Sequence, residues 1–184
     1  MKVRAALRDA TGEHHARVDA LFSVLRLEDA ADYGAFLAAQ AAAHLPVEAA
    51  IDAADVLPLL PDWPERRRAQ ALRDDLAALG QGVPTPLAPP QLSDPAALLG
   101  AIYVLEGARL GGAILLRSVP AGAPTRFLAP GRPGAWRKLM ETLDERLDAP
   151  AAVAQAIAAA QSVFSLFERG GRNLIGTHAL GRRG

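Results

Sequence analysis

Apolar residues recur along most of the chain at intervals of three and four positions, the spacing of residues that share one face of an α-helix. The first predicted helix, from about residue 2 to the low twenties, carries such a face in Leu7, Thr11, Val18 and Leu21. Alanine and leucine fill the later segments between prolines and glycines, and helices are predicted over 33–52, 64–79, 95–117, 135–147 and 150–169. The pattern therefore predicts an all-α protein.

Polar residues and prolines mark the expected helix ends. Side chains that can cap a helix precede three of the predicted helices: Asp29 or Asp32, Asp62, and Ser93 or Asp94. Pro46 lies inside the second helix and is expected to bend it. Segments 80–91 and 119–134 are too rich in proline and glycine for regular structure. Because no internal repeat or change of composition occurs, we predict one helical domain over 1–170 and a loose tail over 171–184.

Composition narrows the class of protein. The 184 residues are 51% hydrophobic, which is enough for a continuous core and argues against disorder. The 20 basic and 20 acidic residues cancel, so nothing draws the chain to nucleic acid or to an anionic membrane. No apolar run approaches the roughly 18 residues of a membrane span, and the first residues carry charges where a signal peptide is apolar. A cytoplasmic protein acting on a small molecule is expected.

The absence of cysteine excludes disulfides, thiolate metal sites and cysteine nucleophiles, so imidazole or carboxylate would hold any metal. No zinc-hydrolase, serine-hydrolase or nucleotide-binding motif is present. Of the four histidines, the adjacent pair His14 and His15 lies in the first helix. Measured from Leu7, His14 falls about 20° away, within the apolar face, and His15 about 80° away, at its edge. Periodicity would bury His14. A ligand for a flat cofactor could instead sit at the edge, or one histidine could be core and the other solvated.

Glycines cluster in the fourth predicted helix, at Gly107, Gly111 and Gly112. Each costs roughly 1 kcal/mol of helix propensity relative to alanine, so the cluster needs a physical reason. One reason is close packing of two helices, since Gly107 and Gly111 share a face. The other is close approach of the backbone to a flat ligand. Spacing alone does not separate the two.

Two motifs resemble those of a known family. The stretch Leu7-Arg-Asp-Ala-Thr-Gly-Glu-His-His15 is similar to the proximal-helix motif of heme oxygenases. The stretch Tyr103-Val-Leu-Glu-Gly-Ala-Arg-Leu-Gly-Gly112 is similar to their glycine-rich distal helix, in the form found in the short bacterial branch associated with bacteriophytochromes. The order and separation of the two motifs also fit. The resemblance extends over most of the chain and implies a heme oxygenase-type helical bundle with heme between the first and fourth helices.

The resemblance also implies roles for individual residues. The proximal ligand of the heme iron falls at His15, which reverses the preference from periodicity. Gly107 and Gly111 fall on the distal glycines, with Gly112 beside them, and such glycines let the helix lie almost on the porphyrin and steer dioxygen toward a meso carbon. Ala108 stands where many heme oxygenases have an aspartate that organises distal water. Proton delivery would then need other groups or water.

Basic side chains are expected to meet the two heme propionates. Arg8 and Arg137 match basic positions of the family, and arginine suits a carboxylate because it can donate two hydrogen bonds to it. Both residues could equally be solvated surface arginines. Glu141 stands where a second basic contact is expected, which leaves the position of ring opening undetermined. Phe167 matches an aromatic residue of the heme pocket, although a core role explains it as well.

The implied reaction is oxidative cleavage of heme to biliverdin with release of iron and carbon monoxide. Heme is then both substrate and cofactor, dioxygen is consumed, and electrons come from a ferredoxin, a flavodoxin or a reductase, because no flavin- or nicotinamide-binding motif is present. A bacteriophytochrome is a possible acceptor of the bilin. Two alternatives stay open: a heme carrier or sensor on the same fold, and a helical interaction domain whose glycines serve packing alone.

Overall fold

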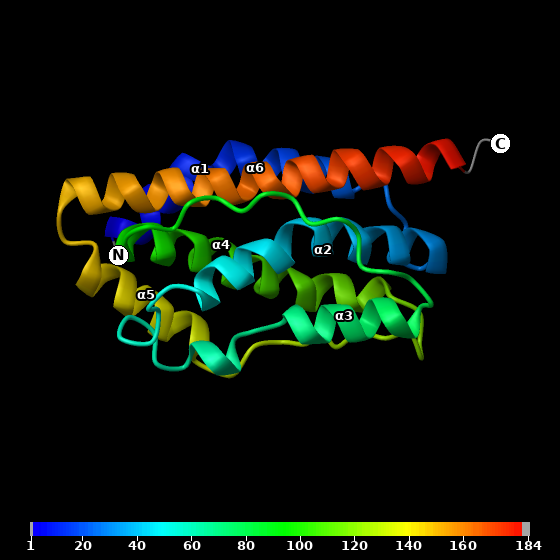
Figure 1. The fold of residues 1–184 in the computed structure, drawn as a ribbon, viewed down its shortest axis with the longest axis horizontal. Helices are drawn as coiled ribbons and strands as arrows, with labels where there is room; N and C mark the ends of the chain where they lie inside the picture. Colours follow the sequence, from blue (N-terminus) through cyan, green and yellow to red (C-terminus); the bar gives the residue numbers. More distant parts are fainter. Residues whose placement is uncertain (1, 182–184) are drawn as a thin grey trace.

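The computed structural model describes residues 2–181. Its elements, in chain order, are α1 (Lys2–Phe22), α2 (Ala30–Asp52), η1 (Trp63–Glu65), α3 (Ala69–Ala78), α4 (Pro95–Leu115), η2 (Leu116–Ser118), α5 (Ala135–Arg146) and α6 (Pro150–Gly181), where η marks a 3₁₀ turn. Helices α1 and α6 run side by side along one edge of the molecule, α2 and α4 lie beneath them, and α3 and α5 form the opposite edge (Figure 1). No strand occurs in the described part of the chain, which confirms the all-α prediction.

Two of the predicted caps are present. The carboxylate of Asp29 accepts hydrogen bonds from the backbone N–H groups of Ala31 and Asp32, at 2.9 and 3.0 Å, and α2 begins directly after it. The carboxylate of Asp94 accepts from the backbone N–H of Ala97 at 2.8 Å at the start of α4. Both contacts satisfy backbone donors that have no partner inside the helix. The extended segment predicted after α3 is also confirmed.

The third predicted helix is wrong in its first half. Instead of one helix over 64–79, the chain forms the short turn η1 and then α3, with a break at Arg66 to Arg68. The break has a tertiary cause, because the backbone N–H of Arg68 donates to the carboxylate of Glu48 at 2.8 Å. Asp62 makes no capping hydrogen bond; its Oδ2 accepts from Arg66 Nη2 at 2.9 Å.

The end of α6 is also later than predicted. Residues 171–181 continue the helix rather than forming a loose tail, and residues 182–184 lie outside the described residues. The two glycines at this point, Gly170 and Gly171, are packing positions. A Cβ at Gly170 would lie 3.0 Å from the carbonyl oxygen of Ala39, and one at Gly171 would overlap Leu21. Ile175, one turn further on, is buried, so this part of α6 belongs to the core.

Helix α6 packs against α1, α2 and α4. It crosses α4 at Gly100, where an added Cβ would overlap the carbonyl group of Ala156. This close approach lets the apolar faces of both helices meet in one core.

Two segments, Pro95–Ser118 and Pro150–Gly176, are long and apolar enough to span a membrane by length and composition. Half of the most apolar stretch of the first and 39% of that of the second are buried inside the fold. Packing between helices therefore buries part of each stretch, not all of it.

Candidate functional site

A cavity of about 680 Å³ opens between α1 and α4, within the ~300–1,000 Å³ typical of small-molecule sites. Helix α1 contributes Arg8, Thr11, Gly12, His15 and Val18 to its lining, and α4 contributes Tyr103, Gly107, Ala108, Gly111 and Gly112, among others. Most of the remaining lining is apolar and aromatic, and includes Phe22, Phe36, Phe127, Trp136, Phe164 and Phe167. The arrangement suits a large, mostly apolar ligand with a few polar attachment points.

The histidine pair divides between the cavity and the core. The His15 side chain lines the cavity and is 63% exposed. Its Nδ1 lies 2.8 Å from Oδ2 of Asp19, one turn along α1. A hydrogen bond at Nδ1 leaves Nε2 as the ring nitrogen for a metal. His14 is not part of the lining; it turns toward α6, where its Nδ1 lies 3.1 Å from Oε1 of Glu168.

The glycines of α4 answer the question that spacing left open. A Cβ built at Gly111 would meet nothing within 4 Å, so this position faces open space. At Gly107 the nearest atom would be a ring carbon of Trp136 at 3.8 Å. At Gly112 a Cβ would lie 3.4 Å from Leu128, which is ordinary contact. The cavity therefore explains Gly111 and Gly107, while Gly112 lines the cavity and also packs against Leu128.

The other wall holds a glycine that sequence reasoning missed. Gly12 lies inside α1 three residues before His15, lines the cavity, and has no atom within 4 Å of its built Cβ. The signal was present in the sequence, because a glycine inside a predicted helix raises the same question on either wall.

Two polar side chains stand together at the cavity. Arg8 is exposed and pairs with Asp9 at 3.3 Å, a surface contact that competes little with a ligand. The Tyr103 hydroxyl lies near Thr11 and near the charge of Arg8. Burial raises the pKa of Tyr103, so the hydroxyl stays protonated and can donate a hydrogen bond. A guanidinium and a phenol at one cavity can receive a carboxylate, and Tyr103 had no functional role in the sequence reasoning.

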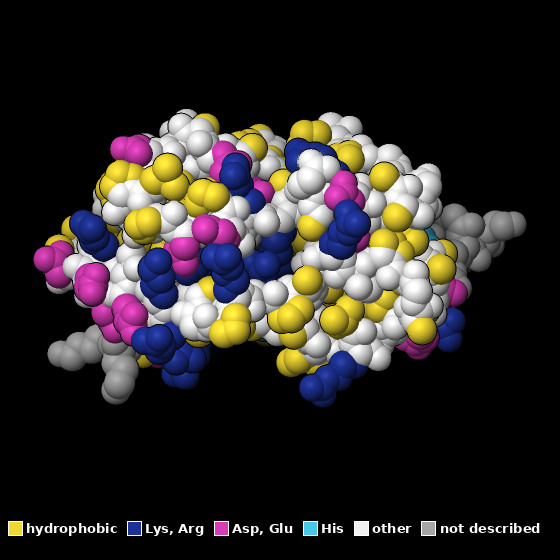
Figure 2. All heavy atoms as spheres, turned by 90° about the horizontal axis from the view of Figure 1, so that it is seen from below, with side chains coloured by type: hydrophobic (Ala, Val, Ile, Leu, Met, Phe, Trp, Pro, Cys, Tyr) yellow, Lys and Arg dark blue, Asp and Glu magenta, His cyan; other side chains and the backbone are white. Residues whose placement is uncertain are grey.

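Arg137, the other predicted partner of a carboxylate, is not among the lining residues. Its side chain is 77% exposed and donates from Nη1 to Oε1 of Glu141 at 2.9 Å, one turn along α5. Basic and acidic side chains are mixed on the underside of the molecule (Figure 2), and Lys138 with Asp62 at 3.5 Å and Arg132 with Glu65 at 3.5 Å are further pairs of this kind. Phe167, by contrast, lines the cavity.

A buried polar cluster lies behind the cavity, between α2, α3 and α4. His44 Nε2 lies 2.9 Å from Oε2 of Glu48, and burial lowers the pKa of His44 to about 4, so the imidazole is neutral at pH 7 and donates this hydrogen bond. Although burial raises the pKa of Glu48, its bonds to His44 and to the backbone N–H groups of Arg68 and Ala69 hold it below its usual range.

The Arg68 side chain connects this cluster to the cavity. Its guanidinium stacks over Phe127 at 4.7 Å and donates to the carbonyl oxygen of Leu105 at 2.7 Å. Burial lowers the pKa of Arg68 to about 10, with the charge of Arg109 acting in the same direction. Arg68 and Gln40 both line the cavity. Neither was predicted, because the local sequence pattern does not show which polar residues the fold will bury.

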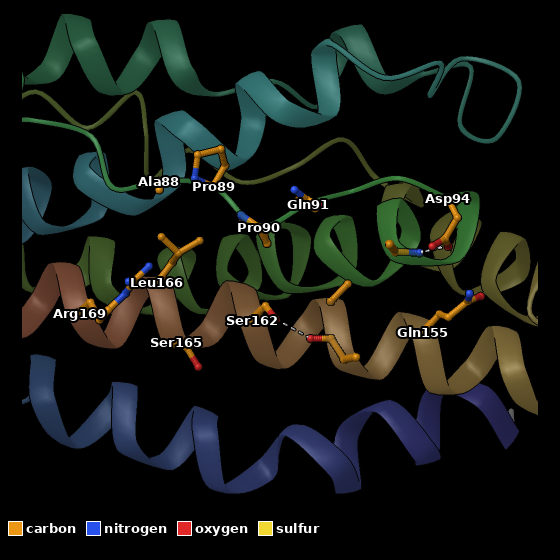
Figure 3. A pocket seen from close by; sticks show the side chains of 13 residues that line it. Ala88, Pro89, Pro90, Gln91, Asp94, Gln155, Ser162, Ser165, Leu166 and Arg169 are labelled. Atoms are coloured by element: carbon orange, nitrogen blue, oxygen red, sulfur yellow. Dashed lines mark hydrogen bonds between the residues drawn. The ribbon is translucent and has the colours of Figure 1, made fainter.

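A second hollow, of about 540 Å³, lies between α6 and the extended segment at Ala88 to Asp94 (Figure 3). Its lining contains none of the predicted site residues, and the hydroxyl of Ser162 is used in a hydrogen bond to the carbonyl oxygen of Ala158 at 2.9 Å. We therefore place the candidate site in the cavity between α1 and α4.

Fold and cavity together define an all-helical protein with one imidazole on one wall and a glycine-lined helix on the other. No family model matches the chain. It is 41% identical over 112 residues to a heme oxygenase of Xanthomonas campestris pv. campestris (strain 8004), an alignment that covers 57% of this chain and 67% of that protein. It superposes with a TM-score of 0.81 on the NO- and CO-bound heme oxygenase from Neisseria meningitidis, over 95% of this chain and 92% of that one, at 26% identity.

The chain belongs to the heme oxygenase family. The family resemblance and the predicted fold class are thereby confirmed, and the association with bacteriophytochromes stays a prediction.

Proposed function

We propose that the protein cleaves heme to biliverdin with release of iron and carbon monoxide, using dioxygen and electrons from another protein. The observation that carries the proposal is the cavity between α1 and α4, with His15 on one wall and the glycines from Gly107 to Gly112 on the other. Membership of the heme oxygenase family supports this reaction over the alternative of a heme carrier or sensor.

The lining fits the chemistry of heme. The aromatic and aliphatic side chains suit the apolar faces of a porphyrin, whose transfer from water is favourable. Leu110 and Ile114 of α4, which are 50% and 67% exposed, line the cavity and would lose exposure against a bound ring. The organisation of residues 1–170 as one domain stays a prediction. The last helix, α6, extends beyond this range, to Gly181.

In this proposal His15 holds the iron through Nε2. Its hydrogen bond to Asp19 fixes the ring and keeps Nδ1 protonated. Heme bound there supplies an iron centre at which dioxygen is activated, and its own ring is the group that is cleaved. An imidazole ligand, unlike a thiolate, does not push electron density toward cleavage of the O–O bond.

On the opposite wall, glycines let the backbone of α4 come close to the ring. Gly111 and Gly107 leave room for the ring to approach α4, and Ala108 supplies no carboxylate. Besides Tyr103 of α4, Gln40 and Arg68 are polar side chains of the lining, and Arg68 stays charged at pH 7 because its pKa is about 10. We propose that they hold ordered water that delivers protons in place of an aspartate.

Arg8 and Tyr103 are proposed to hold one propionate, and Phe167 to pack against the ring. Arg137 stays a predicted partner of the second propionate, although its side chain pairs with Glu141 here.

Electrons are proposed to come from a ferredoxin, a flavodoxin or a reductase in the cytoplasm, and the bilin to pass to a bacteriophytochrome. Heme is the partner that family membership supports.

The test is a spectrum of the protein mixed with hemin, before and after a reductant is added in air. We expect a histidine-ligated Soret band that decays as a bilin band grows, with carbon monoxide released in proportion. Stoichiometric binding with a stable Soret band would favour the carrier. No shift of the hemin spectrum on titration would remove both readings and favour an interaction domain.

A further inference from the structure

Helix α1 carries two adjacent histidines, and its orientation in the fold determines which of them faces the cavity. Neighbouring residues on a helix point about 100° apart, so only one of His14 and His15 can face the cavity at a time. Exchanging the two would take a rotation of α1 about its axis of up to about 100°. The apolar periodicity of α1 predicts that His14 is buried, but it does not identify the contact that keeps His14 in that position.

Glu168 of α6 and Arg17 of α1 hold His14, whose Nδ1 either donates to the carboxylate or accepts from the guanidinium that Glu168 itself anchors. Oε1 of Glu168 lies 3.1 Å from His14 Nδ1 and accepts from Arg17 Nε at 3.2 Å, while Arg17 Nη2 lies 2.8 Å from the same His14 nitrogen. Oε2 of Glu168 accepts from Arg172 at 3.5 Å. The Glu168 side chain is only 11% exposed, and the His14 side chain 21%. Less water surrounds this contact than a surface ion pair, so each partner is costlier to release.

An aromatic side chain from the same helix touches both histidines. The ring of Phe164 stacks on His14 with 6.3 Å between centroids and meets His15 edge-on at 6.0 Å. Phe164 also lines the cavity. One turn of α6, from Phe164 to Glu168, therefore contacts both members of the pair, and α1 and α6 pack side by side along their length (Figure 1).

We propose that Glu168 is a positioning residue that assigns the two histidines: by holding His14 and Arg17 against α6, it sets the rotation of α1 that leaves His15 as the iron ligand. This inference rests on the proposed heme site. Glu168 does not line the cavity, so it acts through His14 and Arg17.

The experiment compares the ferrous heme complexes of the wild type, Glu168→Ala, Glu168→Gln and the double variant Glu168→Ala with His14→Ala. The readout is the iron–histidine stretching band in resonance Raman spectra, together with heme titrations. Arg172→Ala is the matched control, because it removes the exposed partner of Glu168 and leaves His14 and Arg17 in place.

We expect one narrow band in the wild type and in Arg172→Ala. Glu168→Ala should give a broadened or second band and heme binding weaker by roughly tenfold, the lower end of the effect of losing a group that orients a metal ligand. The double variant should return to a single band, because the competing imidazole is gone. Glu168→Gln keeps an oxygen acceptor for Arg17 and should lie between, and it serves as the folded comparison should Glu168→Ala be unstable.

Two results would overturn the inference. The first is an unchanged band in both Glu168 variants with only a lower melting temperature, which would make Glu168 merely structural. The second is a second band that persists in the double variant, which would mean that His14 is not the competitor. Failure of the heme site itself is seen separately, since the wild type would then show no iron–histidine band at all.

Discussion

Two glycines of α4 meet opposite surroundings. At Gly100 the helix crosses α6 so closely that a Cβ would overlap the Ala156 carbonyl. Three turns later, at Gly111, a Cβ would meet nothing within 4 Å. The first half of α4 is a packed seam and the second half is one wall of an open cavity. Glycine allows close helix packing at Gly100 and leaves open space at Gly111. The spacing of the glycines in the sequence does not distinguish these two roles, whereas the fold does.

The seam predicts the largest effect. Gly100→Val would force the α6 backbone away from α4, and we expect a loss of about 3 kcal/mol of unfolding free energy, the upper end of the 1–3 kcal/mol that overpacking of a tight core commonly costs. Urea unfolding followed by far-UV circular dichroism measures it. Gly111→Ala is the matched control and should be stabilising by up to about 1 kcal/mol, through helix propensity alone. Equal midpoints for the two variants would abolish the distinction between seam and cavity.

The buried cluster beside the cavity should make stability depend on pH. The pKa of His44 is about 4 in the folded chain and 6.5 for a free imidazole, so the unfolded chain binds more protons between these values. The contribution is therefore complete above pH 6.5 and is lost as the pH falls toward 4; between pH 7 and 4.5 we expect a decrease of about 2–3 kcal/mol. His44→Gln keeps a donor for Glu48 and does not titrate. Its unfolding free energy should change less over this range, and a parallel curve would contradict the assignment.

Substitution of the cavity-lining histidine of α1 should remove heme ligation rather than lower stability. His15→Ala should abolish the histidine-ligated heme spectrum and weaken heme binding by at least about tenfold, since losing only a group that orients a metal ligand already costs about 10–100-fold. His14→Ala should leave that spectrum largely intact, because His14 faces Glu168. Hemin titrations of both variants give the comparison. If His14→Ala lost the spectrum and His15→Ala kept it, the periodicity of α1 would have been the better guide.

Features that depend on neighbouring residues could be predicted from the sequence, and features that depend on tertiary contacts could not. Helices and caps were predictable because spacing and the Asp29 and Asp94 side chains act locally. The break before α3 and the long α6 were not, because they depend on Arg68 meeting Glu48 twenty residues away and on Gly170 meeting α2.

Among the residues that line the cavity, His15 and the α4 glycines were predicted through the family motifs, whereas periodicity alone favoured His14. The reason is physical: the apolar face of α1 packs against α6, and the cavity lies at the edge of that face. Tyr103, Gln40 and Arg68 reach the cavity from places that only the tertiary structure brings together.

On the α4 wall, Gly111→Leu separates space from packing. A leucine there points into open space, so the fold should be kept or slightly stabilised, by up to about 1 kcal/mol. The side chain would occupy room over the porphyrin, and bilin formation should fall by at least roughly tenfold, about 1.4 kcal/mol in the barrier. Absorbance of the bilin under reductant and air measures it. Unimpaired turnover with an intact fold would mean that the ring does not approach α4.

The smallest effects are expected at the rim, where two arginines differ in what they face. Arg8 lines the cavity beside Tyr103, whereas Arg137 donates to Glu141 on the surface of α5. An exposed ion pair is worth about 0–1 kcal/mol, so Arg8→Ala should weaken heme binding by about threefold to fivefold. Arg137→Ala should change it by less than about twofold if its side chain keeps to Glu141, and by as much as Arg8→Ala if it turns to a propionate. Hemin titration at low and high salt distinguishes these outcomes, because only an arginine that meets a carboxylate of the ligand makes binding salt-dependent.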